Sequence, residues 1–534
     1  MNKSLFFACC IALVFGIQET SLALPSFARQ TEQPCGSCHA DFPQLTPFGR
    51  QFKLNGYTMG AANNTVKNLT DSIRNSIPTN AAPTNTAPSD ATATSAAPTS
   101  TTATSAAPTS AAPTSTTAAA DPTSATATNT APNDPAASNT DATNTEKSYW
   151  VPPISIMGVG GFTHTQAPQD NSGTSLKPND NFLFQSASIF YGGAITDHIG
   201  AFAQATYNAP GFGPAPEFKY SWDNTDIRFA NTGTIANIPF IYGVTVNNNP
   251  TVQDVWNTVP AWGFPFVSSS LAPTPSAAPI INQGFAASVV GAGAYTYINN
   301  LVYIEATGYQ TLSQSTQKTL GVDPTGTPGE FKNIAPYFRI AAEPNWGNNY
   351  LEIGTFGMYA NVEPQPWNFD DIGTDSYFDL GVDSQYQYMG SKYIVTLRNS
   401  LIMENQDLDA SFDNGLASNE NNYLGTLNTQ ASFVYGENFR LPLTVGYFDT
   451  WGSEDELLYA DNGNFSPNSS GWITEIAYIP FGMDKAPLWP WLNARIGLQY
   501  IWYNEFNGVT DYNSALDTKA SDNNTTFVYI WLAM

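Results

Sequence analysis

The feature that most constrains the fold of this chain is the alternation of apolar and polar residues through residues 148–534. Between Leu492 and Trp502 every second residue is apolar, and the residues between them are polar or small except for Ile501. The same alternation runs from Phe378 to Tyr388. Because successive side chains of a β-strand point to opposite faces, this period of two predicts strands with one apolar and one polar face.

The alternating region divides into about 16 strands, joined by connections that are short and long in turn. The predicted strands span residues 150–163, 181–194, 199–209, 217–231, 236–247, 283–298, 300–312, 332–344, 349–361, 374–389, 392–406, 422–435, 438–450, 470–481, 490–504 and 523–534. Residues 299–300 and 390–391 are short turns, whereas residues 248–282 and 451–469 are long loops. Short periplasmic turns and long extracellular loops are typical of outer-membrane β-barrels, which predicts an even number of strands and both barrel ends in the periplasm.

The composition favours such a barrel over a soluble β-sandwich or propeller. Charged residues make up only 12% of the chain and aromatic residues 13%, and a wall that faces lipid needs few charges. Beyond residue 23 no apolar run reaches about 18 residues, so a closed barrel is the remaining way to span a membrane. The formal net charge of −25 argues against a nucleic-acid partner, which would require a basic surface. We therefore predict a mainly β protein, an antiparallel transmembrane barrel in the outer-membrane lipid.

Three segments precede the barrel. Residues 1–23 are typical of a secretory signal peptide, with an apolar stretch that contains Cys9 and Cys10 and a small-x-small cleavage site. Residues 61–147 consist largely of Ala, Thr, Pro, Ser and Asn, a composition that predicts a disordered linker. Between them, residues 24–60 form a small domain that carries the two cysteines of the mature chain.

The sharpest motif in this small domain is the stretch Cys35-Gly36-Ser37-Cys38-His39. C-x-x-C-H is the signature of covalent c-type haem attachment. The two thiols add to the haem vinyl groups, and the adjacent histidine is the proximal ligand of the iron. The alternatives are a redox disulfide and a chance match. We predict one covalently bound haem c, held by Cys35 and Cys38 and ligated by His39.

Other residues of the domain are candidates for the haem environment. Arg29, Arg50 and Lys53 could pair with the haem propionates or could be ordinary solvated charges. Met59 could be the distal ligand, and a thioether ligand would raise the reduction potential. The remaining histidines, His164 and His198, are weaker candidates for that position, and a five-coordinate iron is a further alternative.

Several stretches of the chain resemble the fused cytochrome–porins found in the outer membrane of iron-oxidising bacteria. The matching stretches are residues 24–31 (LPSFARQT), 35–39 (CGSCH), 42–50 (FPQLTPFGR), 52–57 (FKLNGY), 247–257 (NNNPTVQDVWN), 260–265 (PAWGFP) and 520–526 (ASDNNTT). The resemblance implies a monohaem cytochrome c fused to a barrel in the bacterial outer membrane. It implies that electrons pass from extracellular Fe(II) to a periplasmic carrier. The long linker departs from the compact fusion expected of such proteins.

The bilayer core is about 30 Å thick, so a haem in the periplasm could not collect electrons from outside. The hypothesis is therefore that the haem domain enters the barrel lumen and plugs it, which a barrel of this size can accommodate. Inside the cell envelope, a soluble cytochrome c or copper protein would accept the electron. Carboxylates of the outer loops are candidate contacts for iron, since oxygen ligands suit such a cation, although solvated loop charge is the simpler interpretation. These are Asp370, Asp371, Asp407, Asp409, Asp413, Glu454, Asp455 and Glu456.

Two other functions compete with this iron oxidase-like electron transfer. The first is a porin for small solutes in which the haem acts as a gate or sensor. The second is a haem enzyme such as a peroxidase, which requires a distal acid–base group, and residues 24–60 contain no histidine other than His39.

Overall fold

The structure of the chain is a computed structural model that describes residues 25–59, 153–171, 174–209, 211, 219–368, 372–481, 487–513 and 516–534. These residues belong to one compact unit. The predicted signal peptide, residues 1–23, and the predicted linker, residues 61–147, lie outside the described residues.

Sixteen long strands form the wall of a closed antiparallel barrel. The single large sheet contains 18 strands, of which β10 (Gly329–Phe331) and β12 (Asn345–Trp346) are short fragments beside β13. The wall strands are β3 (Ile154–Thr165), β4 (Asp180–Ala194), β5 (Ile199–Asn208), β6 (Tyr220–Ile235), β7 (Ile238–Asn247), β8 (Val289–Ile298), β9 (Val302–Thr311), β11 (Ala335–Ala342), β13 (Asn349–Pro364), β14 (Asp375–Met389), β15 (Tyr393–Asp407), β16 (Asn421–Tyr435), β17 (Leu441–Gly452), β18 (Ser469–Tyr478), β19 (Asn493–Glu505) and β20 (Thr525–Ala533). Each predicted strand corresponds to one of these, which confirms the predicted fold class.

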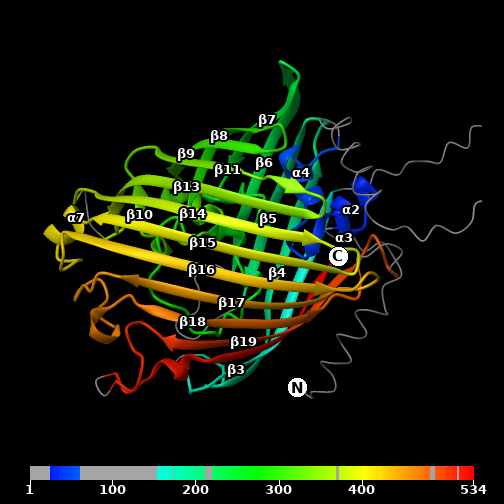
Figure 1. Cartoon of the computed structure of the whole chain (residues 1–534). Coiled ribbons are helices and arrows are strands. Elements are labelled where there is room, and N and C mark those ends of the chain that lie inside the picture. The colour runs from blue at the N-terminus through cyan, green and yellow to red at the C-terminus, as the bar shows by residue number, and fades with distance from the viewer. Residues whose placement is uncertain are drawn as a thin grey trace, which may run out of the picture. The chain divides into compact units, whose positions relative to one another are not determined.

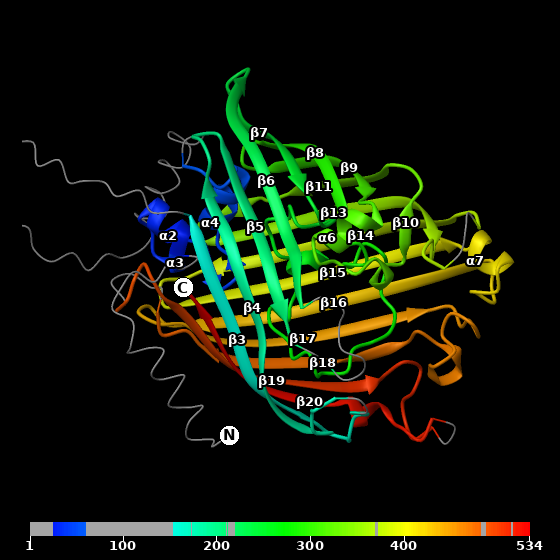
Figure 2. The ribbon, with the colours of Figure 1, turned by 180° about the vertical axis from the view of Figure 1, so that it is seen from behind.

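The barrel closes because its first and last strands pair. Strand β20 runs antiparallel to β3, with Thr525 opposite Thr165 and Ala533 opposite Met157. Figures 1 and 2 show the two strands side by side, cyan against red, and all other strands beside their neighbours in sequence. Closure leaves no wall strand with an unpaired edge, which is the condition for a sheet to stand in lipid.

The side chains alternate between the two faces of the wall as the sequence predicts. On β19, Ile496 and Leu498 are 44% and 45% exposed, whereas Arg495 and Gln499 on either side of this pair are buried in the interior. Ile501, the exception in the sequence pattern, faces inward and packs with Ile473 and Tyr503. An apolar outer face and a polar inner face define an outer-membrane, porin-like barrel. Among the described residues, no helix has the length and apolar character to cross a membrane.

Short and long connections alternate along the wall, as predicted, except that residues 479–492 form a longer connection between β18 and β19. Residues 299–301 join β8 to β9, while residues 248–288 form the long loop between β7 and β8. The prediction was wrong on where β8 begins, since residues 283–288 belong to the loop and β8 starts at Val289. The reason is that Phe285 is fully buried against Phe331, with ring centroids 4.2 Å apart, so an apolar stretch that resembles a strand is loop packed inside the barrel.

The N-terminal segment, residues 25–59, contains short elements. These are α2 (Pro25–Thr31), α3 (Cys35–Cys38), β1 (His39–Asp41), β2 (Gln44–Leu45) and α4 (Pro47–Leu54). Helix α4 begins after Thr46, whose side chain accepts a hydrogen bond from the Gly49 amide, and it has Pro47 at its first position. Both are favourable helix starts. The helix ends before Gly56, whose positive φ of 69° suits glycine.

Candidate functional site

The cysteines of the motif lie one helical turn apart on α3. Residues three apart on a helix share a face, so the geometry brings both sulfur atoms to the same side. Both thiols are free. Desolvation raises the pKa of Cys35 to about 11 and that of Cys38 to about 12, so both are protonated at neutral pH.

The imidazole of His39 is held by its own turn. Its Nδ1 lies 3.0 Å from the carbonyl oxygen of Pro43, and because a carbonyl can only accept, Nδ1 carries the proton. Desolvation lowers the pKa of His39 to about 4, which keeps the ring neutral. A neutral imidazole with its Nδ1 proton engaged leaves Nε2 as the nitrogen available to a metal.

Helix α4 covers α3 and brings Met59 into the same cluster. Gly49 allows this close packing, because a Cβ there would lie 2.2 Å from the Cys38 carbonyl oxygen. Phe48 is 5% exposed and packs against both Cys38 and Met59. The structure therefore brings one of the motif thiols and the candidate distal thioether to the same aromatic ring.

These residues fit a covalent haem. They supply two thiols on one helical face, a neutral imidazole whose Nδ1 is engaged by the backbone, and a nearby thioether, which are the donors that c-type attachment and ligation use. Arg29 donates through Nη2 to the carbonyl oxygen of Ile154 at 2.9 Å, while its buried Nε and Nη1 have no partner. Unpaired guanidinium nitrogens are costly, and a carboxylate such as a propionate would satisfy them. Within the described ranges, no cluster of three or more His, Cys, Asp or Glu side chains offers a separate metal site.

The other two candidate propionate partners contact the barrel instead. Arg50 is fully buried, forms an ion pair with Glu343, and donates to Gln387 Oε1 at 3.0 Å. Lys53 donates to the carbonyl oxygens of Val252 at 2.7 Å and Asp254 at 2.8 Å. A role of Arg50 and Lys53 toward the propionates stays a prediction, and their partners in the structure belong to the wall and to the long loop.

The N-terminal segment contacts inward-facing side chains all around the wall. Tyr57 donates to Asp226 of β6 at 2.7 Å, and Asp41 forms an ion pair with Arg495 of β19. The hydroxyl of Tyr295, on β8, donates to the carbonyl oxygen of Leu54 at 2.7 Å. In Figures 1 and 2 the helices of this segment lie at the barrel end with the short turns.

The long loop 248–288 meets the segment from the other side. Trp256 is 1% exposed, donates through Nε1 to Glu343 at 2.9 Å, and packs beside Leu54. Asn257 accepts a hydrogen bond of 3.1 Å from the Leu45 amide. Glu343 thus contacts both the segment, through Arg50, and the loop, through Trp256.

Sequence reasoning missed a set of buried arginines that tie these parts together. They are Arg228, Arg339, Arg398 and Arg495, all on wall strands and all facing inward. Arg339, for example, pairs with Asp383 at 2.7 Å and with Asp254 of the loop at 3.3 Å. The sequence carried a signal for these arginines, because they stand at polar positions of the alternating pattern. Polar positions of a barrel strand face the interior, since the opposite face of the wall lies in lipid.

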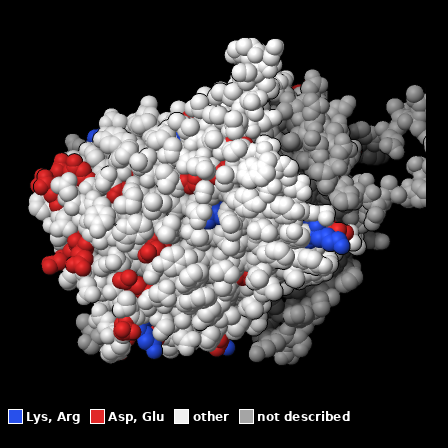
Figure 3. Space-filling view, viewed as in Figure 1, with Lys and Arg blue, Asp and Glu red and all other residues white. Residues whose placement is uncertain are grey.

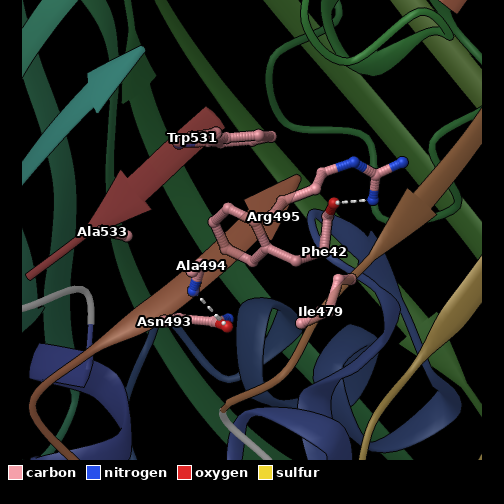
Figure 4. A pocket seen from close by; sticks show the side chains of 7 residues that line it. All are labelled: Phe42, Ile479, Asn493, Ala494, Arg495, Trp531 and Ala533. Carbon is pink, nitrogen blue, oxygen red and sulfur yellow. Dashed lines mark hydrogen bonds between the residues drawn. The ribbon is translucent and has the colours of Figure 1, made fainter. Parts of the chain in front are cut away.

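A small cavity adjoins the turn that follows His39. It is lined by Phe42, Ile479, Asn493, Ala494, Arg495, Trp531 and Ala533. Figure 4 shows Arg495 reaching to the carbonyl of Phe42, with Trp531 near the Phe42 ring. The rings of Phe42 and Trp531 are 4.8 Å apart.

The remaining candidates lie at the two ends of the barrel. His164 pairs with Asp180 at 2.9 Å on the surface, and His198 bonds the carbonyl oxygen of Ala230 at 3.2 Å. The neighbour of His198, Asp197, accepts a hydrogen bond from Thr58 at 3.0 Å, so this turn lies beside the end of the segment.

The outer-loop carboxylates differ in exposure. Asp370 and Asp371 lie outside the described residues. Asp455 is 2% exposed and accepts hydrogen bonds from the amides of Ser418, Asn419 and Leu458, so it holds loops together and is not free to contact a cation. The exposed ones are Asp407, Asp409, Asp413, Glu454 and Glu456. Figure 3 shows carboxylates gathered at the end where α7 (Asp409–Asp413) lies.

Comparison with solved structures gives weak similarity to outer-membrane proteins. No family model and no curated protein sequence matches the chain. Among solved structures, OmpT of Vibrio cholerae matches with 7% identity over 71% of this chain and 97% of its own, at a TM-score of 0.37. The Salmonella typhi OmpF complex with daunomycin matches with 10% identity over 71% of this chain and 97% of its own, at a TM-score of 0.41. Pseudomonas putida OprB matches with 11% identity over 71% of this chain and 93% of its own, at a TM-score of 0.38. The class of this protein, an outer-membrane porin-like barrel, follows from its own strand pairing and its apolar outer face.

Proposed function

We propose that this protein is an outer-membrane electron-transfer cytochrome that accepts electrons from extracellular Fe(II) and passes them to a periplasmic cytochrome c or copper protein. The observation that carries the proposal is the arrangement at the motif, in which Cys35 and Cys38 share a helical face and the adjacent His39 engages the Pro43 carbonyl oxygen through Nδ1. A haem c bound there supplies a one-electron redox centre.

The contacts of the N-terminal segment support a position inside the lumen. Arg50, Tyr57 and Asp41 reach three different parts of the wall, through Glu343, Asp226 and Arg495. The long loop meets the same segment through Lys53 and Leu45. A redox group held there would be closer to the outer surface than one in the periplasm, which shortens the distance an electron must cross.

The protein side chains have defined roles in this scheme. Cys35 and Cys38 attach the haem, His39 is the proximal ligand and Met59 is the candidate distal ligand. Phe48, which packs against Cys38 and Met59, is 5% exposed and keeps water away from them. The exposed carboxylates at the loop end would attract the Fe(II) substrate by their charge and need no fixed coordination site.

The test is a stopped-flow mixture of the purified, haem-loaded protein with Fe(II), in which reduction of the haem is followed by its absorption. We expect reduction in the native chain and no covalent haem in a Cys35→Ala, Cys38→Ala variant. The proposal predicts re-oxidation when a periplasmic cytochrome or copper protein is then added. Absence of reduction at any pH at which the barrel stays folded would remove Fe(II) as the donor.

The fold also supports a second function, a porin for small solutes with the haem as gate or sensor. A 16-strand barrel is wide enough for an aqueous channel. The contacts of the segment and the loop with the inner face of the wall argue against an open channel. Steady conductance of the haem-loaded protein in a planar bilayer would favour this alternative.

A further inference from the structure

One side chain of the wall holds the turn that follows His39. Arg495 on β19 is 2% exposed and donates through Nη1 to the Phe42 carbonyl oxygen at 3.0 Å. The same guanidinium forms ion pairs with Asp41 and with Glu475 of β18. Its Nε donates to the hydroxyl of Tyr529 on β20 at 2.7 Å. A guanidinium with all three nitrogens engaged has a fixed orientation.

This turn contains the hydrogen-bond acceptor of the imidazole. Pro43, whose carbonyl oxygen accepts from His39 Nδ1, directly follows the two residues that Arg495 contacts, Asp41 and Phe42. The series of contacts from the wall to the imidazole is therefore short. Arg495 contacts the backbone of residues 41–43, and this backbone contacts His39.

Aromatic contacts fix the same ring from a second side. The His39 ring meets Phe42 edge-on, with centroids 5.0 Å apart and planes at 70°. Phe42 in turn packs against Trp531 of β20, with centroids 4.8 Å apart. Trp531 and Arg495 stand opposite each other on the paired strands β20 and β19.

We propose that Arg495 is a positioning residue, which sets the orientation of the His39 imidazole by anchoring residues 41–43 to the barrel wall. This inference rests on the haem attachment proposed above. Groups that hold the second nitrogen of a ligating histidine fix the ring orientation and the basicity of the ligand. The orientation of an axial ligand and the hydrogen bonds around it change the reduction potential of a haem. The barrel wall thereby tunes the redox centre, in addition to enclosing it.

The experiment compares Arg495→Lys with Arg339→Lys in the full-length, haem-loaded protein. Arg339 is a matched control because it is equally buried on a wall strand and pairs with Asp383 and Glu352, but it contacts the loop and not the turn at 41–43. Lysine keeps the charge and loses the forked contact with both Asp41 and Phe42. The readouts are the optical and electron paramagnetic resonance spectra of the haem and its midpoint potential.

We expect Arg495→Lys to alter the spectra and to change the reduced-to-oxidised ratio at a fixed potential by about tenfold, which is the lower end of the effect that outer-sphere partners have on metal affinity or activity. Arg339→Lys should leave both unchanged. Asp41→Asn removes the negative charge that Arg495 pairs with and keeps the shape of the side chain. It should shift the spectra in the same direction, and it replaces Arg495→Lys as the test if that variant does not fold.

The outcomes separate the two proposals. If the native chain carries no covalent haem, the proposed function fails. If the haem is present and neither Arg495→Lys nor Asp41→Asn changes spectra or potential, the positioning role of Arg495 is overturned. Equal changes in Arg339→Lys would also overturn it, because the effect would then be a general loss of wall rigidity.

Discussion

The ammonium group of Lys53 donates a hydrogen bond of 2.7 Å to the carbonyl oxygen of Val252, across 199 positions of sequence. It donates a second hydrogen bond, of 2.8 Å, to the carbonyl oxygen of Asp254. The ammonium group also lies 4.7 Å from the centre of the Trp262 ring. One cation thus joins helix α4 of the N-terminal segment to the tip of the long loop.

Replacing Lys53 by methionine should loosen the N-terminal segment. The Asp254 carbonyl oxygen would lose this donor, and the Val252 carbonyl oxygen would keep its hydrogen bond from Trp262 Nε1. We expect a cost of about 1–3 kcal/mol, which corresponds to roughly 5- to 150-fold more undocked segment. Trypsin cleavage after Arg50 in the folded barrel measures that population. Lys318→Met, at an exposed position of α6 (Gln314–Thr319), is the control and should leave the cleavage rate unchanged. An unchanged rate in Lys53→Met would show that the contact does not hold the segment.

Docking of the segment should also depend on pH. Burial lowers the pKa of Lys53 from its ordinary 10.5 to about 7, with Arg228 adding to the effect and Asp226, Asp254 and Glu305 opposing it. Between these two pH values the undocked state binds the extra proton, so the stability of docking rises as pH increases from about 7 toward 10.5. We expect cleavage after Arg50 to slow between pH 7 and pH 9 in the native chain. The change should be absent in Lys53→Met, and an equal change in both would assign it to another group.

If the proposed haem is ligated by Met59, Met59→Leu should lower the reduction potential of that haem. A thioether ligand raises that potential, and leucine keeps the volume beside Phe48 without offering a lone pair. Redox titration followed by absorption is the measurement. Met403→Leu, at an exposed outward position of β15, is the matched control. If the two variants titrate alike, Met59 is not the distal ligand, and the turn that carries His198 becomes the next candidate.

The full-length protein should give no steady porin-sized current in a planar bilayer. Arg50, Tyr57 and Lys53 bind the segment to the wall and to the long loop, and these contacts are buried. A variant that lacks residues 24–147 should conduct more, because the segment is gone while the wall strands remain. Equal conductance of both proteins would argue that the segment does not obstruct the lumen.

Asp455→Asn should loosen the outer loops. The Asp455 carboxylate accepts from the amides of Ser418, Asn419 and Leu458, and although burial opposes it, these hydrogen bonds hold the pKa of Asp455 below its ordinary value. Its stabilising effect is therefore present above the ordinary pKa and is lost as pH falls through the lowered one. Hydrogen exchange at residues 417–420 should be faster in the variant at pH 7, by about 1–3 kcal/mol in opening free energy. Glu456→Gln, at an exposed neighbour, should have no such effect.

The order of the strands and the two faces of the wall could be predicted from the sequence. Successive residues of a strand face lipid and the polar interior in turn, and these two environments require apolar and polar side chains. The period of two is therefore visible in segments such as residues 492–502. The placement of both thiols on one face beside the imidazole could be predicted for a similar reason, because Cys35, Cys38 and His39 lie within five consecutive positions. Their role in haem attachment stays a proposal.

What only the tertiary structure decided is which distant residues meet inside the barrel. Arg495 and Asp41 are 454 positions apart, and Arg50 and Glu343 are 293 apart. Nothing in the local sequence of either partner indicates the other, because such pairs depend on how the segment and the long loop pack within a closed wall. The boundary of β8 was missed for the same reason: Phe285 is apolar in sequence whether it lies on a strand or in a loop, and only the packing against Phe331 distinguishes the two.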